Sequence, residues 1–370
     1  MKKRIFLLLL LFLVGCKNEP SNNTIKIGVF EPLSGLYEES GKEIVKGIQL
    51  AHKENQYVLG KKVELLFYDT KSLEFESANA VSYLAGQKDV IAMIGTYGVD
   101  SMSHALPVIE ATNIPTIASG STYSEIQKSE WSTCLSMNDI HQATAMAQFA
   151  EEYLHLKNIA IIIDEEMSYG EILAYTFSHQ ISPNVKVHLL PYHTGDTTFQ
   201  PQIRRMKDLS IDGVYCPGDP VTSAYLIQAI KQDFPYMTIM GADRWENPSF
   251  YEEGKTDTEG VYFTGHYSPN KLSSTKGPLF ISSYKKNFGT RPNSFSALGY
   301  DSYQALIHAI NQADSTNPHK IQYHIRNIRG LAGVTGQLNV EYGPHEYRPI
   351  KILQQQGKDI YLNRIVEVKN

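Results

Sequence analysis

Two aspartates stand where they could hold the positive pole of a small molecule. Asp243 lies in the segment 241–245, directly after an apolar run, and Asp219 follows Gly218 in a similar position. A carboxylate at the end of a strand can hold an ammonium group through a charge-assisted hydrogen bond. For Asp219, a ligand contact, a helix cap and an exposed turn all remain open.

Two loops that precede expected helices carry groups suited to an anion. The first is GTYGVDS at residues 95–101, and the second is ASGST at residues 118–122. The second loop offers three hydroxyls and a close backbone approach at Gly120. Free N–H groups at a helix N-terminus favour a carboxylate, although the second loop could also be an ordinary N-cap cluster.

The motifs of common enzyme classes are missing. The sequence contains no GxGxxG, Walker A, HExxH or GxSxG pattern. The histidines are scattered, and His188 and His193, which flank an expected strand end, have no carboxylate or cysteine at ligand spacing. We therefore expect no enzyme, no metal and no cofactor. An enzyme built on the same scaffold is the least favoured hypothesis, and it is kept because fold does not fix function.

An alternation of strands and helices must position these loops. Apolar runs such as 25–30, 90–94 and 159–163 alternate with helical segments as far as residue 240. This pattern predicts right-handed βαβ units in parallel sheets, and it is long enough for two of them. The fold class is therefore α/β with two doubly wound parallel sheets. Ligands gather at the carboxyl ends of such strands, where the polar loops lie.

The first residues are typical of an exported lipoprotein. A basic start at 2–4 precedes an apolar run at 5–14, which is too short to span a bilayer. The ending LVGC at 13–16 resembles the bacterial lipobox, in which Cys16 carries a diacylglycerol. The alternative is an ordinary signal peptide with an accidental cysteine. Residues 17–23 form a polar tether.

Length, charge and cysteine content narrow the class further. Residues 24–370 exceed what one hydrophobic core usually serves, so two domains are expected. The net charge is −5 for the full chain and becomes more negative without the basic start, which disfavours nucleic acid as a partner. Cys134 and Cys216 match no zinc or CxxC spacing. Free thiols are favoured over a disulfide, which export would permit.

The order of the motifs resembles the branched-chain amino acid binding proteins, the type I periplasmic binding family of ABC transporters. The match covers nearly all of the chain after the tether. The pieces that carry it are IGVFEPLSGLYEESG at 27–41, Gly95 with Pro107, IPTIASGST at 114–122, Tyr169 with Gly170, Asp243 with Trp245, ALGYDSY at 297–303 and GVTG at 333–336.

The resemblance implies two lobes joined by three crossovers, with hinge closure around a ligand in the cleft. The expected boundaries are residues 24–139 plus 268–341 for lobe 1, residues 140–267 plus 342–370 for lobe 2, and crossovers near Asn138, His266 and Glu341.

The resemblance also implies a binding set. In relatives that bind amino acids, hydroxyls in two lobe 1 loops hold the carboxylate, and an acidic residue of lobe 2 holds the ammonium. Thr122 and Asp243 match two of these positions. The expected ligand-binding residues are Tyr37, Tyr97, Ser101, Gly120, Ser121, Thr122, Tyr169, Asp219 and Asp243.

The first carboxylate loop departs from the family pattern. Gly98 and Val99 stand where members usually place adjacent serines. One hydroxyl anchor is therefore missing, and Ser101, Tyr97 or the loop amides would have to replace it. The departure weakens the case for an ordinary aliphatic amino acid as ligand.

The sequence thus predicts an extracytoplasmic solute-binding lipoprotein of an ABC transporter. It would act as a monomer, bind an amino acid or amide-like solute, and deliver it to a permease, while Cys16 anchors it to the lipid bilayer of the cell envelope. The alternative is a ligand-sensing module that partners a receptor kinase or chemoreceptor.

Overall fold

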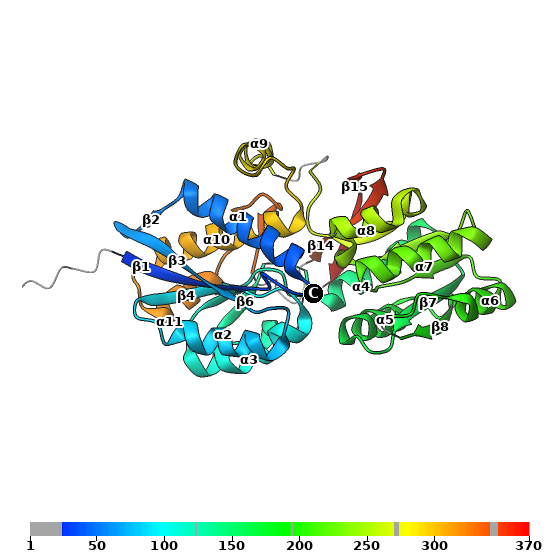
Figure 1. The fold of residues 1–370 in the computed structure, drawn as a ribbon, viewed down its shortest axis with the longest axis horizontal. Helices are drawn as coiled ribbons and strands as arrows, with labels where there is room; N and C mark the ends of the chain where they lie inside the picture. The colour runs from blue at the N-terminus through cyan, green and yellow to red at the C-terminus, as the bar shows by residue number, and fades with distance from the viewer. Residues whose placement is uncertain are drawn as a thin grey trace, which may run out of the picture.

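Two lobes lie end to end along the longest axis of the molecule, each built around its own sheet (Figure 1). The computed structural model describes residues 24–369 except 123, 136, 194, 270–273 and 341–346. The predicted signal segment with Cys16, and the crossover expected near Glu341, lie outside these residues. Within them, no helix is long and apolar enough to cross a membrane.

The first lobe holds a six-stranded sheet in the order β2-β3-β1-β4-β5-β6. Its strands are β1 (Thr24–Glu31), β2 (Tyr57–Val58), β3 (Lys61–Asp69), β4 (Val90–Gly95), β5 (Thr116–Ala118) and β6 (Ser132–Cys134). All neighbouring strands run parallel except the β2–β3 pair.

Helices cover both faces of this sheet. The helices of the first lobe are α1 (Glu38–Glu54), α2 (Glu74–Ala85), α3 (Val99–Thr112), α9 (Gly277–Phe288), α10 (Ser294–Ala313) and α11 (Pro318–Arg326). Ile27 of β1 joins the buried cluster of α1 and α10, whereas Phe30 joins that of α2 and α3. Burial on both faces explains why such strands are continuous apolar runs.

The second lobe holds a seven-stranded sheet in the order β15-β14-β11-β10-β9-β7-β8. Its strands are β7 (Asn158–Asp164), β8 (Lys186–Tyr192), β9 (Gly213–Tyr215), β10 (Thr238–Gly241), β11 (Tyr262–Gly265), β14 (Tyr347–Gln356) and β15 (Asp359–Lys369). Strands β7 to β11 pair in parallel, but β14 and β15 form an antiparallel hairpin along the β11 edge. The alternation of strands and helices predicted from the sequence ends near residue 240, so it did not include this hairpin.

The helices of the second lobe alternate with its parallel strands, as the sequence predicts. They are α4 (Asp139–Gln148), α5 (Ser168–Gln180), α6 (Gln200–Leu209), α7 (Pro220–Asp233) and α8 (Pro248–Gly254). Shorter helical turns in this lobe are η2 (Phe149–Tyr153), η3 (Asp243–Glu246) and η4 (Lys255–Thr258), and η1 (Ser124–Lys128) lies between β5 and β6 of the first lobe.

The chain passes between the lobes three times. It leaves the first sheet between β6 and α4, returns between β11 and α9, and leaves again between β13 (Gln337–Leu338) and β14. A short pair, β12 (Leu331–Ala332) with β13, precedes the last passage. Cys134 and Cys216 lie on different lobes and are not joined by a disulfide. The α/β fold with two parallel-rich sheets is confirmed.

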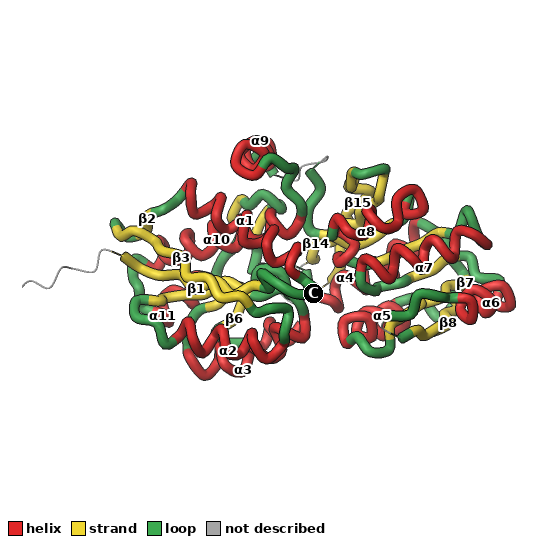
Figure 2. The backbone as a smooth tube through the Cα atoms, viewed as in Figure 1, coloured by secondary structure: helices red, strands yellow, loops and turns green. Residues whose placement is uncertain are grey.

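Loops gather where the two lobes meet, as Figure 2 shows in green. The hydrogen bonds there include one from the Asn247 side chain to the Ser40 hydroxyl at 3.1 Å, and one from the Asp139 N–H, at the start of α4, to the Thr122 carbonyl at 3.1 Å. The polar loops of the first lobe therefore face η3 and the start of α4.

Candidate functional site

A largely buried polar cluster lies at this junction, and we call it the interlobe cluster. Its members come from the loops after β1, β4 and β5, from the first turns of α4 and α5, and from η3. They are Tyr37, Tyr97, Thr122, Asp139, Gln142, Tyr169, Asp243 and Arg244.

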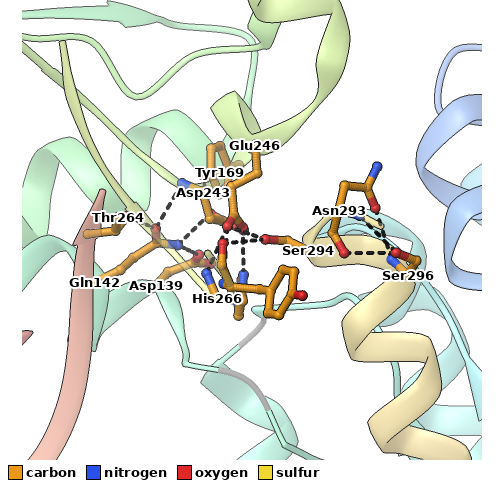
Figure 3. A network of polar contacts seen from close by, with 11 residues as sticks. Asp139, Gln142, Tyr169, Asp243, Glu246, Thr264, His266, Asn293, Ser294 and Ser296 are labelled. Carbon is orange, nitrogen blue, oxygen red and sulfur yellow. Dashed lines mark hydrogen bonds and ion pairs between the residues drawn. The ribbon is translucent and has the colours of Figure 1, made fainter. Parts of the chain in front are cut away.

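Asp243 is the centre of the cluster and begins η3 directly after β10. Its Oδ1 accepts hydrogen bonds from Tyr169 Oη at 2.6 Å and from Gln142 Nε2 at 2.9 Å (Figure 3). Gln142 is fixed in turn, because its Oε1 accepts from Thr264 Oγ1 at 2.6 Å. These bonds hold the Asp243 carboxylate in one orientation.

A second carboxylate, Asp139, lies beside the first. Gln142 Nε2 also donates to Asp139 Oδ1 at 2.9 Å, whereas the buried Oδ2 has no hydrogen-bond partner. Burial, together with the negative charge of Asp243, raises the pKa of Asp139 to about 7, although hydrogen bonds and the charge of Arg244 oppose the rise. Asp139 can therefore gain or lose a proton near neutral pH.

Arg244 places a cation in the same cluster. Its Cζ lies 4.0 Å from the ring centre of Tyr169 in the second lobe and 5.7 Å from that of Tyr37 in the first. Both distances are within the range of cation–π attraction. The guanidinium thus bridges the two lobes through ring faces.

The loops of the first lobe are set by a buried acid, Glu31, at the end of β1. Tyr97 N–H donates to Glu31 Oε2 at 2.9 Å, and the Ser119 hydroxyl donates to Oε1. Burial raises the pKa of Glu31 to about 8, against these two hydrogen bonds. Glu31 therefore ties the loop after β4 to the loop after β5.

Gly120 is packed closely against other parts of the first lobe. It forms a bridge with Tyr97, and an added Cβ would lie 2.9 Å from Ile44 Cδ1 and 3.1 Å from Tyr97 Cδ2. The ring of Tyr97 meets that of Tyr37 edge to face, with centres 5.5 Å apart. The two tyrosines thus line one side of the junction.

The unusual pair Gly98 and Val99 has a structural reason. Gly98 has φ of +94°, in the region that favours glycine. Val99 is buried in a cluster that includes Met137 and Tyr169, on the second lobe's side of the junction. An apolar contact between the lobes therefore replaces a hydroxyl in this loop.

The structure brings six of the nine predicted ligand-binding residues to the junction: Tyr37, Tyr97, Gly120, Thr122, Tyr169 and Asp243. Ser121 is buried, and its carbonyl accepts from the Cys134 thiol at 3.2 Å; Ser101 is buried in the first turn of α3.

Asp219 caps α7, one of the alternatives left open by the sequence. Its Oδ1 accepts from the N–H groups of Val221 at 3.0 Å and Thr222 at 3.1 Å. This arrangement satisfies two donors that the first turn of a helix cannot pair internally.

Three members of the cluster were missed from the sequence: Asp139, Gln142 and Arg244. Arg244 stands in a segment already singled out, between Asp243 and Trp245. Asp139 and Gln142 follow the crossover expected near Asn138, and this position next to both lobes could have indicated them as site residues. Their side chains contact the others only because α4 begins at that crossover.

The cluster combines donors, acceptors and both signs of charge at the junction of the two lobes. Among the described residues, no group of three His, Cys, Asp or Glu side chains could hold a metal ion. An arrangement of two lobes around charged and aromatic groups is that of a solute-binding protein.

The chain belongs to the periplasmic binding protein family, whose model matches residues 24–348. The Leu/Ile/Val-binding protein homolog 3 of Brucella melitensis is 24% identical over 305 residues, covering 79% of this chain and 80% of that protein. The leucine-binding protein LivK of Thermotoga maritima is 28% identical with a TM-score of 0.86, covering 92% of this chain and 98% of that one. LivJ of Streptococcus pneumoniae, solved with isoleucine, is 22% identical with a TM-score of 0.84, covering 93% and 99%.

Proposed function

We propose that this protein is the extracytoplasmic solute receptor of an ABC transporter and binds an amino acid or a similar small polar solute. The observation that carries the proposal is the interlobe cluster, to which both lobes contribute charged or aromatic groups. Relatives named for leucine, isoleucine and valine support the solute class.

The two poles of such a solute would meet different lobes. Asp243, fixed by Tyr169 and Gln142, would accept the ammonium group. Gly120 and Thr122 stand in the first-lobe loop after β5, where Gly120 forms a bridge with Tyr97 and the Thr122 carbonyl accepts from the Asp139 N–H. Contacts from both lobes would favour the closed form when the solute is bound.

The lobes of this proposal are residues 24–139 plus 268–341 and residues 140–267 plus 342–370. Closure of one lobe on the other would create the surface that a permease binds. The ligand would leave unchanged, so recovery of the intact solute from the complex is expected.

We also propose that Cys16 anchors the protein to the membrane. Its place after a basic and apolar leader supports this. Cys16→Ser should move the protein from the membrane fraction to the soluble fraction of the host cell. A Cys16→Ser protein that stays with the membrane would contradict the lipid anchor.

A ligand screen tests the main proposal. The chain from residue 17, which keeps every described residue, is heated with amino acids, amides, urea, small polyols and benzoate, and hits are measured by calorimetry. A receptor should be stabilised by one solute or a few related ones, because binding to the folded form raises Tm. Absence of any hit would contradict a receptor for small polar solutes.

A further inference from the structure

The guanidinium of Arg244 is a buried cation with an unused hydrogen-bond donor. Only 5% of the residue is exposed, and its Nη1 has no hydrogen-bond partner. None of the ion pairs among the residues that the structure describes involves Arg244. Ring faces attract its charge, but they do not replace an acceptor for its N–H groups.

A buried donor that lacks an acceptor raises the free energy of the folded protein, so an acceptor for Arg244 Nη1 would be stabilising. A buried charge that lacks a hydrogen-bonded partner destabilises the folded protein. The side chain is held by Tyr169 from one lobe and by Tyr37 from the other. Arg244 therefore lies at the junction where a ligand enclosed by both lobes would be found.

The first lobe offers less to an anion than its loops suggest. Gly98 carries no side chain, and Val99 is packed into an apolar cluster with Tyr169. A carboxylate in this site therefore needs another anchor. Arg244 is a cation with several donors in a plane that matches a carboxylate.

An unused acceptor accompanies the unused donor. Asp139 Oδ2 is buried in the same cluster and has no hydrogen-bond partner. Asp243 stands next to Arg244 in η3 and has its Oδ1 oriented by two donors. A molecule with one positive and one negative group would complete both open positions.

We propose that Arg244 holds the carboxylate of a zwitterionic amino acid, while Asp139 and Asp243 hold its ammonium group. The inference rests on the proposed function and narrows it, because it requires a ligand with a free carboxylate. It also moves the main anion contact from the first lobe to the second. Arg244 is then a residue that determines specificity.

Calorimetry with matched ligands tests this assignment. The twenty standard L-amino acids are titrated into the chain from residue 17, and the tightest binder is compared with its own α-amide. The α-amide should bind at least about tenfold more weakly, since it lacks the charge that Arg244 would pair. Equal binding of acid and amide would overturn the inference.

Substitution of the arginine gives the second arm. Arg244→Gln should weaken binding of the amino acid at least about tenfold but that of its α-amide much less, and Arg244→Lys should fall between. Arg205→Gln is the matched control, because Arg205 is exposed on α6, within the second lobe. Unchanged affinity of Arg244→Gln for the amino acid would contradict the assignment.

The outcomes separate this inference from the function it rests on. If a solute without a carboxylate binds tightly and no amino acid does, the receptor stands and the role of Arg244 is wrong. If nothing in the wider solute panel binds, both fail.

Discussion

Two buried charged residues, Arg244 and Glu246, lie in the same short helix η3 and meet opposite surroundings. Glu246 Oε1 accepts from the His266 N–H at 3.0 Å, from the Tyr267 N–H at 3.4 Å and from the Ser294 hydroxyl, and Oε2 lies 3.1 Å from His266 Nδ1. Figure 3 shows this set beside the interlobe cluster. Arg244, in contrast, leaves Nη1 without a partner.

The difference is the one expected between a structural charge and the ligand contact proposed for Arg244. The partners of Glu246 come from the end of β11, where the chain returns to the first lobe, and from the start of α10. Although burial opposes it, the hydrogen bond and charge of Glu246 raise the pKa of His266. Glu246 has its hydrogen bonds complete at a crossover between the lobes, whereas the open donor of Arg244 is what the proposed ligand contact requires.

The largest expected effect is the loss of Glu246. Glu246→Ala would leave His266 and the Ser294 hydroxyl buried without their acceptor, so the free energy of unfolding should fall by about 3–5 kcal/mol. Urea denaturation followed by circular dichroism measures this change. The exposed neighbour Glu252 supplies the control, Glu252→Ala. A loss within about 0.5 kcal/mol, as is usual for surface substitutions, would contradict a structural role for Glu246.

The next effect concerns ligand affinity. Asp243→Ala should weaken binding of an amine-bearing ligand by about 2–5 kcal/mol, because the ammonium group would lose its buried partner. Stability should change less than in Glu246→Ala, since Tyr169 and Gln142 can rehydrate when the lobes open. Calorimetry with the solute found in the screen measures the affinity, and an unchanged Kd would remove Asp243 from the site.

The fold could be predicted from the sequence much further than the site. Apolar runs such as 90–94 and 159–163 fix strands by burial on both faces, and they became β4 and β7. The β14–β15 hairpin was not predicted, because it adds antiparallel strands after the βαβ series has ended. Periodicity reports which face of an element is buried, but not which distant element covers it.

Site residues were predictable where they stand in loops after strands, as with Tyr97 and Asp243. Gln142 could not be found in this way, because it lies inside a helix and reaches Asp243 across 101 positions of sequence. The sequence also could not show that a donor of Arg244 lacks a hydrogen-bond partner. Whether a charge has a partner depends on geometry that no local pattern contains.

A pH titration extends the comparison to a third buried ionisable residue, Glu31. Its pKa is raised from 4.5 to about 8, mainly by burial. Between these values the unfolded chain loses the proton while the folded chain keeps it, so stability should fall as pH rises, by at most about 1.4 kcal/mol per pH unit.

Glu31→Gln should remove this part of the slope. The Ser119 hydroxyl, which donates to Glu31 Oε1, can rotate and accept from the new amide. Denaturation at pH 5, 6, 7 and 8 of both proteins gives the difference. Parallel curves for the wild type and the variant would show that Glu31 is ionised in the folded protein throughout.

The smallest expected effect separates the two aspartates that the sequence treated alike. Asp219 follows β9 as Asp243 follows β10, but its Oδ1 accepts from two N–H groups of α7. Asp219→Ala should therefore lower the free energy of unfolding by about 1 kcal/mol, the usual loss for an N-cap, and leave Kd unchanged. Asp219→Asn should restore most of the stability, because an amide oxygen caps equally well. Weaker ligand binding by both variants would instead place Asp219 in the binding set. The position of an aspartate after a strand would then be a better guide to function than whether its carboxylate already accepts hydrogen bonds.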